Sequence, residues 1–241
     1  MKSLKIALIG YGKMGKVVEK IAGERGHSID LIIDNEIDWQ EKNVHLSKCD
    51  AAIEFTTPDN VINNLLSCFR SGIPVVTGTT GWYDKFSEVE KECTSSKGSL
   101  FYATNFSIGV NIFFELNRKL ASLMAQTKGY APEIEEIHHI HKLDAPSGTA
   151  ISLANDLLKF FPDKKVWKNE KTHRPEELPV MSVREGEIPG THTITWKGEN
   201  DLIEIKHEAF NRLGLALGAV MAAEFLTGKT GIYTMQDMLK I

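Results

Sequence analysis

The residues with the clearest capacity for chemistry lie at 133–150, where the chain reads EIEEIHHIHKLDAPSGTA. Three histidines, His138, His139 and His141, stand within four residues of Lys142. Histidine titrates near neutral pH, and a lysine close to other cations releases its proton more readily. The cluster therefore favours proton transfer and anion binding over the alternative of solvated surface side chains.

The end of the same stretch is typical of a loop that leads into a helix. Pro146 stiffens the loop, and Ser147 or Thr149 can cap a helix over residues 150–158. Free amides at Ser147, Gly148 and Thr149 would bind a carboxylate or phosphate, because a helix N-terminus presents unpaired N–H groups. An ordinary helix cap is the alternative, and the two interpretations are compatible.

A metal site is the rival interpretation of the histidines. His139 and His141 would share one face of a strand, but the sequence has no HExxH motif and no evident third ligand. We therefore predict no metal.

A second group of residues suited to binding chemistry lies near the start of the chain. An apolar strand at 4–9 is followed by a G-x-G-x-x-G motif and a helix, and the next strand, 31–33, ends in Asp34. This order predicts a dinucleotide site, whereas a plain structural turn is the alternative. The predicted cofactor-binding residues of the motif are Gly10, Tyr11, Gly12, Lys13, Met14 and Gly15.

Asp34 bears on the choice of cofactor. An acid at the tip of the second strand can accept both ribose hydroxyls of NADH. It would repel the 2′-phosphate of NADPH, and Asn35 rather than an arginine follows it. The sequence favours NADH over NADPH, although Lys13 or another base could reach the phosphate.

Two further loops follow predicted strands. Gly78, Thr79 and Thr80 follow a strand at 74–77, and Thr104, Asn105 and Phe106 follow a strand at 100–103 that ends in Ala103. Ligands of open parallel sheets bind at the carboxyl ends of the strands. For the first loop, a turn with a helix cap is an equally good interpretation.

The elements around these residues predict an α/β protein. Strands and helices alternate through the first half, as in a Rossmann-like doubly wound parallel sheet, and the strand at 100–103 is expected to close it. A long helix at 108–126 and a strand at 133–138 follow. A polar loop is expected at 159–177 and a hairpin at 192–206. A small-residue helix from Leu213 and a short final helix complete the chain.

Composition is that of an ordinary globular protein. The chain has 241 residues, is 42% hydrophobic and carries a net charge of −4. We expect neither nucleic acid nor membrane as partner. Cys49, Cys68 and Cys93 show no metal-ligand spacing, and no signal peptide is evident. Reduced cysteines of this kind predict a cytoplasmic protein.

The stretch at 133–150 resembles the signature of the dihydrodipicolinate reductase family, in the pattern E-x-E-x₂-HH-x₂-K-x-DAPSGTA. The likeness covers essentially the whole chain. It includes the glycine loop, one residue shorter than in some members, the segments 78–80 and 103–107, and the later blocks at 182–186, 190–192, 207–212 and 231–239.

The resemblance implies roles that spacing alone does not. His138 would donate or accept a proton, and Lys142 would donate one. His139 would contact the substrate, and Gly148 with Thr149 would bind a substrate carboxylate. The segments 78–80 and 103–107 would contact the nicotinamide.

The resemblance also implies an activity and an architecture. The reaction would be NAD(P)H-dependent reduction of 4-hydroxy-tetrahydrodipicolinate, a cyclic dicarboxylate with an imine, to tetrahydrodipicolinate in lysine and diaminopimelate biosynthesis. Residues 1–106 and 213–241 would form the dinucleotide-binding domain. Residues 107–212 would form an α+β domain with an open mixed sheet for substrate binding and assembly of a homotetramer.

Two other functions are compatible with parts of the sequence. A dehydrogenase of an acyclic semialdehyde would bring a catalytic cysteine, but all three cysteines fall in the nucleotide-binding half. A non-catalytic NADH sensor would keep the glycine loop and lose His138 and Lys142, which are present. The departures from the family are mild: Asn211 stands where a serine is frequent, and the loop near Lys168 is short.

Overall fold

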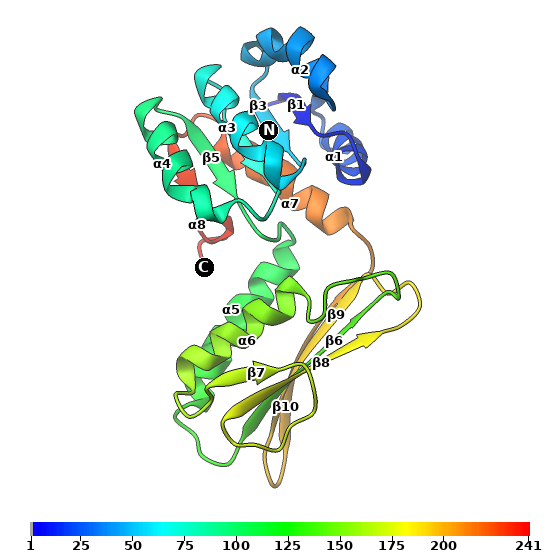
Figure 1. The fold of residues 1–241 in the computed structure, drawn as a ribbon, viewed down its shortest axis with the longest axis vertical. Helices are drawn as coiled ribbons and strands as arrows, with labels where there is room; N and C mark the ends of the chain where they lie inside the picture. The colour runs from blue at the N-terminus through cyan, green and yellow to red at the C-terminus, as the bar shows by residue number, and fades with distance from the viewer. Residues whose placement is uncertain (1) are drawn as a thin grey trace. The chain divides into compact units, whose positions relative to one another are not determined.

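The computed structural model describes residues 2–241. They form two compact units (Figure 1): the first unit contains the residues up to Ile108 together with Leu213–Ile241, and the second unit is Gly109–Arg212.

The first unit is built on a six-stranded sheet in which every pairing is parallel. The strand order is β11-β5-β4-β3-β1-β2. The order reverses beside β1, which is where doubly wound sheets bind ligands. The predicted Rossmann-like fold is confirmed. The strands are β1 (Lys5–Ile9), β2 (Ser28–Ile33), β3 (Ala51–Glu54), β4 (Val75–Thr77), β5 (Ser99–Tyr102) and β11 (Gly231–Tyr233).

Helices cover both faces of this sheet because its strands are apolar on both sides. On β1, Ile6 and Leu8 pack into a core with α1 (Lys13–Glu24) and α7 (Leu213–Leu226). The alternate residues, Ala7 and Ile9, pack into a second core with α3 (Pro58–Arg70) and α4 (Phe86–Ser95). The small side chains of α7 let it lie against β3, β4 and β5.

Two features of the first unit differ from the predictions. The strand at 100–103 does not close the sheet, because β11 pairs with β5 at its outer edge. Three residues are too few to show a strand pattern, so the sequence predicts only the final helix, α8 (Met235–Leu239), in this part of the chain. The segment after Asp34 also forms helix α2 (Glu36–Lys42) and a 3₁₀ helix (Asn43–Lys48), neither of which was predicted.

The second unit is a five-stranded mixed sheet of order β10-β9-β6-β8-β7, which confirms the predicted open mixed sheet. Strand β6 is parallel to β8 and antiparallel to β9. Helices α5 and α6 lie side by side against one face (Figure 1), where they bury Ile134, Ile194 and Trp196. The elements are α5 (Ile108–Met124), β6 (Ala131–His138), α6 (Gly148–Phe160), β7 (Val166–Lys168), β8 (Glu177–Arg184), β9 (Gly190–Lys197) and β10 (Leu202–Ala209).

The second unit corrects two expectations. The polar segment 159–177 is not wholly a loop, because β7 lies within it as a short edge strand. His139 and His141 do not share the face of a strand, since β6 ends at His138 and both residues lie in the turn that follows. Among the described residues, no helix is long and apolar enough to cross a membrane.

Candidate active site

The glycine loop connects β1 to α1 and is shaped by close backbone contacts. A Cβ at Gly10, whose φ is +91°, would lie 2.1 Å from the carbonyl oxygen of Phe55. A Cβ at Gly15 would lie 2.4 Å from the carbonyl oxygen of Gly10. Gly12 differs, because nothing in the described chain lies within 4 Å of its Cβ position. Gly10 and Gly15 thus serve packing, and Gly12 leaves space for an approaching ligand.

This open space is part of a hollow of about 490 Å³. The hollow brings two predicted segments together, the glycine loop and the loop after β4. Its walls are Gly12, Lys13, Met14, Phe55, Thr56, Pro58, Gly78, Thr79 and Thr80.

The loop after β4 is held by Glu54, a fully buried carboxylate at the end of β3. Glu54 accepts hydrogen bonds from Thr77 Oγ1 at 2.5 Å, Thr79 Oγ1 at 3.0 Å and the Thr56 amide at 3.0 Å. Burial raises the pKa of Glu54, although these donors oppose the shift. Glu54 could not be recognised from the sequence, because one acid at the end of an apolar strand gives no local signal.

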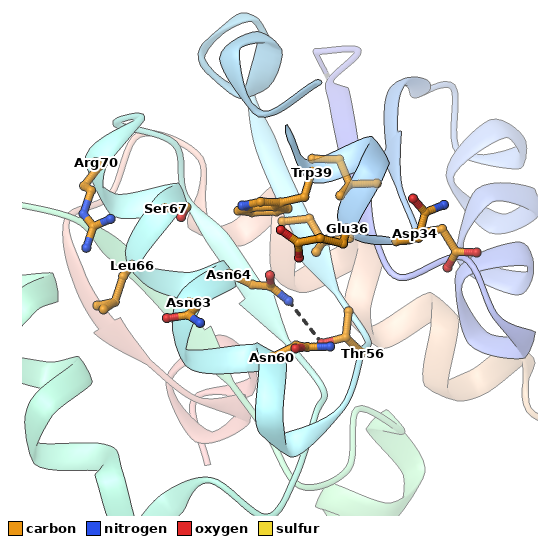
Figure 2. Close-up of a pocket in the computed structure, with 13 residues that line it drawn as sticks. Asp34, Glu36, Trp39, Thr56, Asn60, Asn63, Asn64, Leu66, Ser67 and Arg70 are labelled. Carbon is orange, nitrogen blue, oxygen red and sulfur yellow. Dashed lines mark hydrogen bonds between the residues drawn. The ribbon is translucent and has the colours of Figure 1, made fainter. Parts of the chain in front are cut away.

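A second hollow, of about 540 Å³, lies beside Asp34 at the carboxyl ends of β1, β2 and β3. The Asp34 carboxylate accepts the Tyr11 amide at 2.5 Å, which ties the tip of β2 to the glycine loop. Figure 2 shows Arg70 at the opposite end of this hollow from Asp34, with Trp39 and Glu36 between them. The end of the hollow beside the glycine loop is therefore acidic.

The segment after β5 combines exposed Thr104 and half-buried Asn105 with two buried residues. Phe106 is buried and packs against Phe101 and Phe55, with ring centroids 5.8 and 6.0 Å apart. Ala103 is also buried. A contact of residues 103–106 with a cofactor stays a prediction.

In the second unit, the predicted proton-transfer and anion-binding residues converge at the end of β6. His138 is its last residue and is buried, and Ser147 caps α6 by accepting the Ala150 amide at 3.2 Å. Lys142 Nζ lies 2.8 and 2.9 Å from the two carboxylate oxygens of Asp144. The partner of Lys142 in this structure is thus an acid, not the cations that the sequence suggested.

Glu136 connects these groups and was also missed. It lies two residues before His138 on the same face of β6, and its side chain is fully buried. Its Oε2 is 2.8 Å from His138 Nδ1. Its Oε1 accepts the Ser147 amide at 3.0 Å and Arg184 Nη2 at 3.1 Å. Burial opposes ionisation of Glu136, but the hydrogen bonds outweigh it and hold the pKa well below its usual range.

The helix N-terminus consequently differs from the expectation. The Ser147 amide is not free, because Glu136 occupies it. The amides of Gly148 and Thr149 belong to the first turn of α6, where an α-helix provides no acceptor for them. Two of the three predicted amides thus suit an anion.

The other histidines are placed differently from one another. His139 is half-buried, and its amide donates to the Ile188 carbonyl at 2.8 Å. His141 is exposed and lies 3.2 Å from Glu187. His192 of β9 is buried beside Ser147, with Nε2 and Oγ 3.1 Å apart. Burial lowers the pKa of His192 to about 3, so this imidazole is neutral at physiological pH.

Glu136, His138 and His192 also place donor atoms within 4.8 Å of one another, a spacing that can suit a metal ion. The Arg184 guanidinium at 3.1 Å from the same carboxylate would repel a cation there. The arrangement therefore favours a hydrogen-bonded charge network, and we assign no metal ligand. The predicted absence of a metal stays a prediction.

Comparisons with known proteins agree along the whole chain. The family model for the N-terminus of dihydrodipicolinate reductase matches residues 4–106, and the model for its C-terminus matches 109–239. The 4-hydroxy-tetrahydrodipicolinate reductase of Christiangramia forsetii is 46% identical over 98% of both chains. That of Thermosipho africanus is 35% identical over 98% of both. A solved structure, dipicolinate-bound dihydrodipicolinate reductase from Paenisporosarcina sp. TG-14, has the same fold, with a TM-score of 0.74 and 23% identity over 98% of this chain and 99% of that one.

Proposed function

The chain belongs to the dihydrodipicolinate reductase family, and on that premise we propose that it reduces 4-hydroxy-tetrahydrodipicolinate to tetrahydrodipicolinate with NAD(P)H. This reaction is a step of lysine and diaminopimelate biosynthesis. The observation that carries the proposal is the match of both family models, together with 46% identity over 98% of the chain to a reductase of that name.

The chemistry of the substrate determines which groups the site must supply. Conversion of the hydroxylated ring to the product replaces a hydroxyl by hydrogen, so a hydride and a proton are taken up and water leaves. A nicotinamide supplies the hydride. The protein must then supply a proton donor and a site for two carboxylates.

The first unit has the features required to hold the cofactor. We assign the pyrophosphate to the open space at Gly12 and the N-terminus of α1, and the nicotinamide to the hollow that Thr79 and Thr80 line. The hollow beside Asp34 suits the adenosine end. Asp34 and Glu36 oppose a 2′-phosphate there, which supports a preference for NADH.

The second unit carries the groups that handle protons and the substrate. We assign proton transfer to His138 and Lys142, in line with their place at the end of β6 and in the loop after it. The amides of Gly148 and Thr149 would hold one carboxylate of a cyclic dicarboxylate, and His139 would contact the same substrate.

Assembly and location complete the proposal. We propose a cytoplasmic homotetramer formed through the second unit. Edge strand β10 pairs only with β9 among the described strands, and Leu202 on it is exposed. An unpaired edge of this length is a natural contact for another copy. Light scattering coupled to size-exclusion chromatography tests the tetramer, and a monomer at micromolar concentration would exclude it.

The activity is tested by supplying purified protein with the condensation product of pyruvate and aspartate semialdehyde. NADH or NADPH should be oxidised with this product and not with either precursor alone. The competing function, a dehydrogenase of a linear semialdehyde, predicts the reverse pattern. Turnover of the linear aldehyde without turnover of the cyclic product would refute the proposal.

A further inference from the structure

Glu136 is placed to control two parts of the site through one carboxylate. Strand pairing sets His192 opposite Glu136 and Arg184 beside His138. One carboxylate oxygen of Glu136 lies 2.8 Å from His138 Nδ1, and the other accepts the Ser147 amide at 3.0 Å. The Glu136 side chain is fully buried, so its carboxylate makes both contacts away from solvent.

The Nε2 of the His138 imidazole lies against Gly190. A Cβ at Gly190 would lie 2.9 Å from this nitrogen, so only a residue without a side chain fits beside it. An imidazole whose Nδ1 faces a carboxylate presents Nε2 as its reactive nitrogen. The geometry thus separates an inner nitrogen, toward Glu136, from an outer nitrogen next to Gly190.

Arg184 ties the same carboxylate to the anion-binding loop. Its Nη2 lies 3.1 Å from Glu136 Oε1 and donates to the Asp144 carbonyl at 2.7 Å. The Ser147 amide donates to that same Oε1, so the loop is held at both of its ends. A charged acceptor strengthens such hydrogen bonds about twofold over a neutral one.

We propose that Glu136 is a positioning residue for the reduction. Glu136 holds the His138 imidazole with Nδ1 protonated and Nε2 available to the substrate. It also anchors the start of α6 through the Ser147 amide. The proposal rests on the proposed function, because it takes His138 as a proton-transfer group. Glu136 itself acts through His138 and Ser147.

Titratable side chains from each neighbouring element face Glu136 and His138. Arg184 comes from β8, His192 from β9, and Lys142 from the loop after β6. His192 is neutral, so it adds no charge. The Glu136 carboxylate is therefore the negative charge in direct contact with His138.

Glu136→Gln is the test, because it keeps the shape of the side chain and removes the charge. We expect kcat to fall roughly 10- to 10³-fold, part of what a positioned acid–base group contributes, with unchanged NADH affinity. The pH profile of kcat/KM in Glu136→Gln should differ from that of the wild-type enzyme. Glu135→Gln, an exposed neighbour on the opposite face of β6, should retain wild-type kcat and pH profile.

A measurement on the wild-type protein keeps the proposal testable if Glu136→Gln does not fold. ¹⁵N-histidine NMR should show His138 with a protonated Nδ1, its signals assigned by their loss in His138→Gln. A neutral His138 protonated on Nε2 would overturn the proposal, as would an unchanged pH profile in a folded Glu136→Gln enzyme. Absence of turnover in the wild type would instead refute the proposed function, and the NMR result would still decide the Glu136–His138 pairing.

Discussion

Replacing His192 by glutamine should change how the stability of the protein depends on pH. The His192 side chain is buried, and burial lowers its pKa from 6.5 to about 3. In the unfolded chain the same imidazole takes up a proton near pH 6.5. Glutamine cannot titrate and retains a polar group that can bond to Ser147 Oγ, which lies 3.1 Å from His192 Nε2.

The sign and size of the effect follow from proton linkage. Below pH 6.5 the unfolded state binds a proton at this position and the folded state does not, so acidification lowers the free energy of unfolding. The slope approaches about 1.4 kcal/mol per pH unit, which gives a loss of about 1 kcal/mol between pH 7.0 and 5.5. Glu136, whose pKa is depressed in the folded state, loses its stabilisation only below about pH 4.5 and does not contribute in this window.

Urea unfolding followed by tryptophan fluorescence at pH 7.0 and 5.5 measures the effect, at one fixed protein concentration. The stability advantage of wild type over His192→Gln should shrink by about 1 kcal/mol on acidification. His141→Gln is the matched control, because it makes the same substitution at an exposed imidazole. If the difference in the free energy of unfolding between wild type and His192→Gln is the same at both pH values, His192 is not held neutral in the folded protein.

Four further substitutions test the cofactor and proton-transfer sites. Asp34→Asn should shift the NADPH/NADH ratio of kcat/KM about tenfold toward NADPH, because one exposed charge is worth on the order of 1 kcal/mol. An unchanged ratio would show that Asp34 does not determine the cofactor preference. Gly12→Ala should raise the Kd for NADH about tenfold or more at constant Tm, whereas Gly10→Ala should lower Tm, because its Cβ would lie 2.1 Å from a carbonyl oxygen. Calorimetric titration and thermal melts separate these outcomes, and equal effects on Tm would contradict them. Gly190→Ala should lower kcat at least about tenfold with unchanged NADH affinity, because its Cβ would lie 2.9 Å from His138 Nε2 and displace the imidazole. An unaltered kcat would show that the position of His138 Nε2 does not matter for the reaction.

The parts of the fold that could be predicted depend on local patterns. The glycine loop lies between a strand and a helix whose apolar spacing is evident from the sequence, and Asp34 follows the next strand directly. The N-cap role of Ser147 is equally local, since it involves the amide of Ala150 three residues on. Each of these features depends on residues within one supersecondary unit.

The parts that could not be predicted depend on pairing between distant segments. Glu136 meets Arg184, 48 residues away, only because β6 and β8 lie in register. Glu54 gains its donors from Thr77 and Thr79 through the pairing of β3 with β4. Strand β11 needs the free edge of β5 to form at all. No periodicity in a single segment contains this information.

Steady-state kinetics of two single variants is the sharpest test of proton transfer by His138 and Lys142. His138→Gln and Lys142→Gln should each lower kcat for the cyclic substrate by roughly 10²–10⁴, the usual contribution of a general acid or base, while the Kd for NADH stays at the wild-type value. Wild-type kcat in both variants would show that neither residue transfers a proton in the reaction.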